Sequence, residues 1–150
     1  MSAEQVEIRR PVAEDRDAWL IRWQGYLTFY KTTLPDHRTD SLWQRLLDDE
    51  DPVQGRVALV DGQVVGLAHF FPQPNTWFGT TCYLNDVFVD PELRGGGIGR
   101  ALINAVADEA RALGCHHVYW HTQHFNQPGR LLYDSMTGGV SDFVVYNLGL

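Results

Sequence analysis

The chain has 150 residues, of which 44% are hydrophobic and 21% are charged, and its formal net charge is −7 at pH 7. This length predicts a single domain over residues 1–150, because it allows one sizeable core and is short for two. The composition is that of a soluble globular protein, without a membrane span or signal peptide, so we expect a cytoplasmic protein with no membrane partner. The negative charge disfavours nucleic-acid binding, so no nucleic-acid partner is expected.

Hydrophobic periodicity predicts a strand, two helices and a hairpin in the first half of the chain. The second helix can begin at Thr39 or Asp40, since either side chain can cap a first turn. The hairpin should turn at Asp61-Gly62, a dipeptide typical of two-residue turns. The expected ranges are a strand over 6–10, a helix over 13–30, a helix ending at 47, strands over 54–60 and 63–72, and a loop over 73–79.

The second half of the chain alternates strands and helices. Gly114 should stop the first of these helices. A strand–helix–strand crossover joins parallel strands, so the strands that flank this helix should be parallel. The order predicts an α/β fold with a mixed central sheet. The expected ranges are a strand over 82–89, a helix over 98–113, a strand over 117–122, a helix over 127–136 and a closing strand over 142–148.

A glycine-rich loop, Arg94-Gly95-Gly96-Gly97-Ile98-Gly99-Arg100, joins the predicted strand over 82–89 to its helix. Glycines lack the Cβ atoms that keep a ligand away from the backbone, and they permit positive φ. The first N–H groups of the helix have no partner within the helix, and the positive end of the helix dipole lies behind them. The loop therefore predicts an anion site suited to a phosphate or pyrophosphate.

Two common phosphate-binding patterns do not match this loop. A dinucleotide fingerprint needs a third glycine where Leu102 or Arg100 stands, and an acidic residue about 20 positions on, near Cys115. A P-loop needs a lysine that the loop lacks. A turn that merely joins strand to helix remains the alternative, although such a turn seldom needs four glycines in five positions.

The spacing R-x-x-G-x-G at Arg94, Gly97 and Gly99 resembles the acetyl-CoA motif of the Gcn5-related N-acetyltransferase superfamily. The resemblance implies the acetyltransferase fold, a mixed sheet with splayed parallel strands flanked by about four helices. It also implies acetyl-CoA as co-substrate, held at the loop and at a strand edge that pairs with its pantetheine amides. The implied contacts are Val87, Phe88, Val89, Arg94, Gly95, Gly96, Gly97, Ile98, Gly99, Arg100 and Asn126.

A second motif lies near the C-terminus, where Asn126 is followed seven residues later by Tyr133. Seven residues are about two helical turns, so both side chains should share one face of a helix. By resemblance to the superfamily, Asn126 contacts the pantetheine arm and Tyr133 is the general acid that protonates the leaving thiolate. The alternative is that Asn126 only caps the helix and Tyr133 only packs.

The resemblance is nearest to the diamine and polyamine branch and to a yeast histone and polyamine acetyltransferase group. It rests on Tyr83-Leu84-x-Asp86-x-Phe88-Val89, on Asn126-x-Pro128, and on the segment 118–122. Asn85 stands where the polyamine branch carries glutamate, and an amide cannot take a proton from an ammonium. Monoamines or amino-acid-like amines should therefore rival long polyamines as acceptors.

Asp86 is the first candidate for the group that takes a proton from the acceptor or holds it. The alternatives are that water or His121 serves as the base, and that Asp86 only satisfies a buried backbone donor. His117 and His121 should share one face of a strand, but no zinc motif accompanies them, so no metal is expected. Cys82 and Cys115 should be reduced thiols rather than nucleophiles.

The sequence thus predicts an acetyl-CoA-dependent N-acetyltransferase that moves an acetyl group to a primary amine by direct attack. A small cationic amine is the expected acceptor, and a homodimer the expected assembly. The alternatives are a protein acetyltransferase that modifies a lysine or an N-terminus, and a non-catalytic acyl-CoA-binding module.

Overall fold

The computed structural model describes residues 5–150, in which the chain forms two compact units that divide between Trp120 and His121. The single domain predicted over 1–150 stays a prediction, and residues 1–4 lie outside the described part. The first unit holds strands β1 (Val6–Arg9), β2 (Gln54–Val60), β3 (Gln63–Asn75), β4 (Gly79–Val89) and β5 (Val118–Tyr119), with helices α1 (Arg16–Phe29), α2 (Asp36–Leu47) and α3 (Ile98–Ala112).

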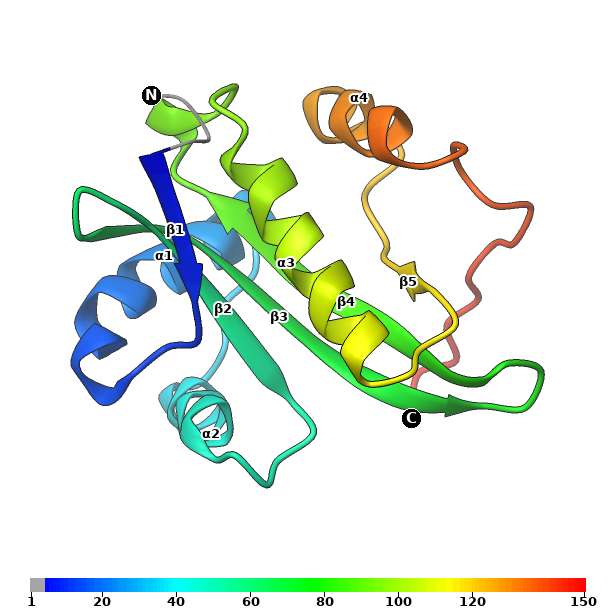
Figure 1. The fold of residues 1–150 in the computed structure, drawn as a ribbon, viewed down its shortest axis with the longest axis horizontal. Helices are drawn as coiled ribbons and strands as arrows, with labels where there is room; N and C mark the ends of the chain where they lie inside the picture. The colour runs from blue at the N-terminus through cyan, green and yellow to red at the C-terminus, as the bar shows by residue number, and fades with distance from the viewer. Residues whose placement is uncertain (1–4) are drawn as a thin grey trace. The chain divides into compact units, whose positions relative to one another are not determined.

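The described strands of the first unit form one mixed sheet in the order β1-β2-β3-β4-β5 (Figure 1). The first four strands are antiparallel neighbours, and β5 joins β4 in parallel. The predicted α/β class and the predicted parallel pair around the glycine-loop helix are confirmed. The hairpin between β2 and β3 turns as predicted, with φ of 50° at Asp61 and 77° at Gly62.

Helix α3 covers one face of this sheet, and α1 and α2 cover the opposite face (Figure 1). The apolar stripe predicted for α3 is buried against the sheet. A Cβ at Gly66 of β3 would lie 3.2 Å from the Leu102 side chain and 2.9 Å from the Phe88 carbonyl oxygen. Glycine at position 66 therefore allows α3 to approach the strands closely.

The opposite face is built around three tryptophans, Trp19 and Trp23 of α1 and Trp43 of α2, all of which are buried. The ring centroids of Trp19 and Trp43 lie 4.8 Å apart. Leu67 of β3 and Phe88 of β4 belong to the same cluster. The aromatic side of α1 therefore forms core, and it packs directly beneath the strand that carries Asp86.

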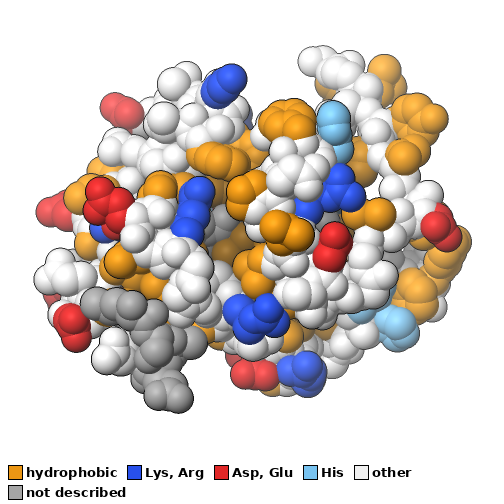
Figure 2. Space-filling view, turned by 90° about the horizontal axis from the view of Figure 1, so that it is seen from above, with side chains coloured by type: hydrophobic (Ala, Val, Ile, Leu, Met, Phe, Trp, Pro, Cys, Tyr) orange, Lys and Arg blue, Asp and Glu red, His pale blue; other side chains and the backbone are white. Residues whose placement is uncertain are grey.

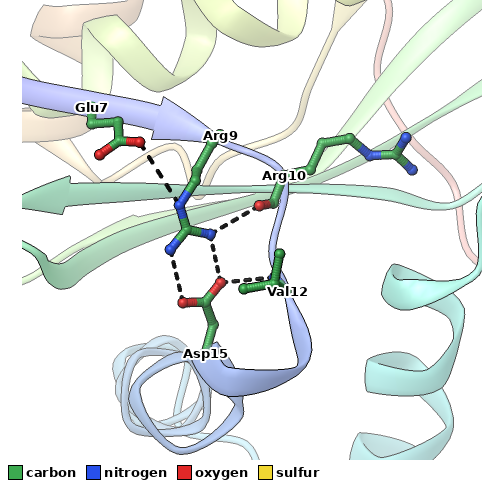
Figure 3. A network of polar contacts seen from close by, with 5 residues as sticks. All are labelled: Glu7, Arg9, Arg10, Val12 and Asp15. Atoms are coloured by element: carbon green, nitrogen blue, oxygen red, sulfur yellow. Dashed lines mark hydrogen bonds and ion pairs between the residues drawn. The ribbon is translucent and has the colours of Figure 1, made fainter.

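An ion pair joins the end of β1 to the start of α1 (Figure 3). Arg9 donates from Nη1 and Nη2 to the two carboxylate oxygens of Asp15, at 2.7 and 3.0 Å, and the Val12 N–H donates to the same carboxylate at 2.8 Å. The hydrogen bond from Arg9 lowers the pKa of Asp15. The stability that this carboxylate contributes is therefore present above its unfolded-state pKa, and it is lost as the pH falls through the lower folded-state pKa.

Helix α2 begins at Asp36, directly after Pro35, so the predicted start at Thr39 or Asp40 is wrong. Both side chains have partners elsewhere. Thr39 Oγ1 accepts a hydrogen bond from Trp23 Nε1 at 3.2 Å, and Asp40 pairs with Arg16 at 2.8 Å. The two residues join α2 to α1 instead of capping a helix.

The hairpin between β3 and β4 is longer than predicted. Residues 73–75 belong to β3 and pair with β4, so the expectation of a loop from residue 73 is wrong there. Pro74 is tolerated because β3 is no longer paired with β2 beyond Phe70, and a missing N–H costs little on such an edge. Strand β5 is only two residues long, against six predicted.

The second unit contains helix α4 (Gln127–Met136), as predicted. The closing strand predicted over 142–148 is wrong, because these residues have no strand or helix assignment and are exposed. Their pattern suits a strand, but a strand requires hydrogen bonds to a neighbouring strand. Residues 121–150 include no strand, so this segment has no strand neighbour within its unit.

Candidate active site

The glycine loop leads into α3 with the backbone conformation that its sequence favours. Gly95 and Gly97 have φ of 90° and 84°, and Gly97 is the N-cap of α3 in the left-handed region. No side chain caps the helix start, and no acidic residue lies in its first turn. The first backbone N–H groups of α3 are therefore presented at the loop without a built-in anion, as a phosphate site requires.

Arg94 precedes this loop and packs over two aromatic rings. Its guanidinium carbon lies 5.5 Å from the Phe29 ring centroid and 5.4 Å from that of Phe88. Its Nε donates to the Val89 carbonyl oxygen at 3.3 Å. The three side chains line an open cleft of about 490 Å³ between α1 and the segment that leads to α3. Arg94 thus places a positive charge next to the glycine loop.

Strand β4 has an open edge close to the loop. It pairs with β3 over most of its length, but with β5 only at Cys82 and Tyr83. Asn85 interrupts the register with β3 as a bulge, since His69 pairs with Asp86 and Phe70 with Leu84. On the β5 side, residues 87–89 have no strand neighbour among the described residues. The backbone edge of residues 87–89 is therefore open to hydrogen bonds with an extended ligand.

Asp86 follows the bulge and lies on the face covered by α1. Its side chain is 12% exposed, and Oδ2 lies 3.0 Å from Nδ1 of His69 on β3. The structure therefore gives Asp86 a side-chain partner, whereas the sequence alternative supposed a backbone donor. His69 was missed by sequence reasoning. Its only signal was a histidine within the apolar run of β3, and nothing in that run indicates a contact with a residue 17 positions later.

Tyr26 of α1 approaches the same carboxylate. Burial raises the pKa of Tyr26, and the Asp86 carboxylate and its hydrogen bond with Tyr26 raise this pKa further. The hydroxyl oxygen also lies 3.4 Å from the Asn85 carbonyl oxygen. At neutral pH the phenol is therefore a hydrogen-bond donor beside Asp86.

Asn126 and Tyr133 lie in the second unit, Asn126 as the N-cap of α4 and Tyr133 within the helix. Asn126 caps the helix as its alternative role supposed, with Oδ1 accepting from the Gly129 N–H at 3.3 Å, while its Nδ2 donates to Thr122 Oγ1 at 2.9 Å. Tyr133 is half-buried, two turns along the helix. The predicted helix is confirmed. The shared face of the two side chains and their contact with coenzyme A stay predictions.

The histidines are arranged differently from the expectation. Strand β5 ends at Tyr119, so the prediction that His117 and His121 share one strand face is wrong. His121 is exposed in the second unit. Within residues 5–150, no three histidine, cysteine or acidic side chains are grouped so that they could hold a metal ion.

The two cysteines are poor candidates for covalent chemistry. Burial raises the pKa of Cys82 to about 12, and the neighbouring Cys115 contributes to this rise. Burial also raises the pKa of Cys115. Both groups are therefore thiols rather than thiolates at neutral pH, and a thiol is a weak nucleophile.

Comparison with known proteins identifies the class. The family model of the acetyltransferase (GNAT) family matches residues 17–138. D-amino-acid N-acetyltransferase HPA3 from Saccharomyces cerevisiae is 31% identical over 136 residues, which cover 89% of this chain and 84% of the relative. Thialysine N-epsilon-acetyltransferase from Bos taurus is 36% identical over 73 residues, 49% of this chain and 43% of the relative.

A solved structure supports the fold. Aminoglycoside N-acetyltransferase AAC(6')-Iy, in complex with CoA, superposes with a TM-score of 0.84 at 18% identity and covers 96% of this chain and 94% of its own. The chain belongs to the acetyltransferase (GNAT) family and is an N-acetyltransferase, which confirms the superfamily resemblance of its glycine loop. In the described residues, no helix is long and apolar enough to span a membrane.

Proposed function

We propose that the chain, as a single domain, transfers an acetyl group from acetyl-CoA to a small primary amine by direct attack. One observation carries the proposal. Strand β4 bears the largely buried Asp86, and after the short turn Pro91–Leu93 it leads to a glycine loop at the start of α3, which no side chain caps. The anion site and the carboxylate therefore lie close together in the chain, and they suit a phosphorylated acetyl donor and a cationic acceptor.

The residues present fit acetyl-CoA, which supplies the thioester that the amine attacks. Gly95 has open space where a Cβ would stand, so the backbone there can approach a phosphate. The loop 94–100 would hold the pyrophosphate. The open edge at Val87, Phe88 and Val89 would pair with the pantetheine amides, and Asn126 would contact the same arm.

The chemistry assigned to this chain is proton transfer and orientation. Asp86 would take a proton from the ammonium, whose nitrogen then attacks the acetyl carbonyl carbon as the carbon–sulfur bond breaks. A backbone N–H of the β4 edge would polarise that carbonyl. Tyr133 would give its proton to the departing thiolate. His121 and water remain the alternative bases.

The acceptor should be cationic at neutral pH. The chain carries 19 acidic residues against 12 lysines and arginines, and Asp86 is a carboxylate with little exposure. Acidic and basic side chains are interspersed on the face shown in Figure 2, so the net charge is not gathered into one acidic patch there. The proposal therefore relies on local recognition by Asp86 and not on a long-range field. The relatives named for D-amino acids and thialysine support an amine of amino-acid size.

A thiol-release assay with acetyl-CoA tests this function. The panel should contain monoamines, amino acids of both configurations, polyamines, neutral anilines and histone peptides. Release with small cationic amines supports the proposal. Acetylation of anilines alone contradicts the charge argument, preference for peptides supports the protein acetyltransferase, and acetyl-CoA binding without any release supports the non-catalytic module.

The glycine loop gives a matched pair of variants. Gly97→Ala should lower acetyl-CoA affinity about 10- to 100-fold, because the new Cβ stands at the helix start where a phosphate must approach. Gly62→Ala is the control, since Gly62 also has positive φ and lies in the remote hairpin turn. Each variant should lose about 1 kcal/mol of stability from this backbone strain. Calorimetry should find weakened binding only for Gly97→Ala; equal affinities would place the phosphates elsewhere.

We further propose a cytoplasmic homodimer. The free thiols at Cys82 and Cys115 suit a reducing compartment. Residues 143–146 are Phe-Val-Val-Tyr and are 66–91% exposed, and an apolar run of this kind is seldom left to water. Replacing Val145 with Asp should shift sedimentation-equilibrium mass from two chains to one. A monomeric unaltered protein would contradict the dimer.

A further inference from the structure

His69 connects the aromatic core to Asp86. The two residues are register partners in the β3–β4 pair, and His69 is only 2% exposed. Nδ1 of its ring lies 3.0 Å from Asp86 Oδ2, and Nε2 accepts a hydrogen bond from Trp19 Nε1 at 3.0 Å. A continuous chain of two hydrogen bonds therefore runs from Trp19 of α1, through His69, to the carboxylate.

This pattern determines where the protons are. An indole N–H only donates, so Nε2 of His69 must be unprotonated. A neutral imidazole carries its single proton on the other nitrogen, and Nδ1–H then donates to Oδ2. In an imidazolium, Nε2 would also carry a proton, and its N–H would point at the N–H of Trp19. A proton on Oδ2 would likewise point at the N–H of His69 Nδ1. The geometry therefore selects a neutral His69 beside an unprotonated oxygen of Asp86.

The imidazole is also fixed in orientation. The ring of Trp23 meets it edge-on with centroids 5.1 Å apart, and the ring of Trp19 lies at 5.9 Å. Trp23 is itself held by its hydrogen bond to Thr39. The ring cannot turn without breaking contacts in the buried core. A fixed donor of this kind gives the carboxylate one defined orientation.

We propose that His69, held in the Nδ1–H tautomer by Trp19, is the positioning residue that aims the Asp86 carboxylate at the acceptor amine. The inference rests on the proposed function, because it requires Asp86 to receive or hold the ammonium. His69 donates to Oδ2, and Tyr26 also donates to this carboxylate. A carboxylate has about four acceptor positions, so the remaining ones are open to the amine. In the transfer, an N–H bond of the ammonium breaks and an O–H bond forms on the Asp86 carboxylate. His69 does not pass this proton on, since its far nitrogen faces a donor.

The tautomer can be measured on the unaltered protein. Long-range ¹H–¹⁵N correlation spectra of the imidazole rings separate nitrogens that carry a proton from those that do not. The chain has six histidines, and the signal of His69 is identified by its absence from the His69→Gln variant. A protonated Nδ1 and an unprotonated Nε2 are expected at neutral pH. The opposite tautomer, or an imidazolium, would overturn the inference.

Two variants of His69 test the positioning role in catalysis. His69→Gln can still accept from Trp19 and donate to Asp86, whereas His69→Leu can do neither. We expect His69→Leu to lower kcat/KM for the amine about 10- to 100-fold at unchanged acetyl-CoA affinity. His69→Gln should recover most of this loss. Equal losses in the two variants, or full activity of His69→Leu, would contradict positioning.

The double variant separates this inference from the function it rests on. If His69 acts through Asp86, His69→Leu should cause little further loss in an Asp86→Asn background. An inactive Asp86→Asn with a fully active His69→Leu rejects only the positioning role. An active Asp86→Asn rejects the role of Asp86, and the inference with it. If His69→Leu does not fold, the tautomer measurement and His69→Gln decide, since both use folded protein.

Discussion

Replacing Tyr133 with phenylalanine should lower kcat about 10- to 1000-fold while acetyl-CoA affinity changes little. The ring stays and only the hydroxyl is lost, so packing on α4 is kept. Without that proton donor, the thiolate of coenzyme A must leave unprotonated into a semi-enclosed site, which is costly. Turnover is measured by thiol release at saturating amine, and affinity by calorimetry.

Tyr146→Phe is the matched control in the same unit. Tyr146 is 91% exposed and belongs to the proposed dimer surface, but phenylalanine keeps its ring, and its hydroxyl has no proposed role. This variant should turn over like the unaltered enzyme. Equal turnover of both variants would make Tyr133 a packing residue, which was its alternative role. A loss that appears in acetyl-CoA affinity instead of kcat would assign Tyr133 to binding.

Replacing Asp86 with asparagine should lower kcat/KM for the amine about 100-fold or more at neutral pH. Asparagine can still accept the hydrogen bond of His69, so the local structure should persist, but it cannot take a proton. A lysine-like ammonium with a pKa near 10.4 is free amine in only about one molecule in 2,500 at pH 7. The Asp86→Asn variant can use only this small fraction of free amine. The unaltered enzyme would instead generate free amine at the site, because Asp86 takes the proton.

The pH dependence gives this prediction its own signature. The rate of Asp86→Asn should rise with pH in proportion to the free amine, so its deficit should shrink as the pH approaches the pKa of the acceptor. Asp61→Asn is the control, because Asp61 lies in the hairpin turn with φ of 50°, where asparagine is well tolerated. A deficit independent of pH would make Asp86 an anchor for the cation rather than its base.

The elements with strong local patterns were predictable. The stripe of α3, the Asp61-Gly62 turn, the parallel β4–β5 pair and helix α4 all lie where the periodicity, the turn residues or the crossover rule placed them. The errors lie where tertiary contacts decide. Thr39 and Asp40 have the chemistry of helix caps, but they bond to Trp23 and Arg16 of α1. Residues 142–148 have the pattern of a strand, without a strand neighbour in their unit.

By itself, the sequence determined the class of this protein: the glycine loop between a strand and an amphipathic helix, and the Asn–Tyr pair on a later helix, rest on local backbone conformation and helical spacing. Only the tertiary structure decided which residues surround Asp86. The bulge at Asn85 and the pairing of β3 with β4 bring His69 to its carboxylate, and the packing of α1 brings Trp19 and Tyr26. His69 and Asp86 are 17 positions apart in the chain, and Trp19 and His69 are 50 positions apart. No local pattern encodes these contacts, because they depend on which strands and helices pack together.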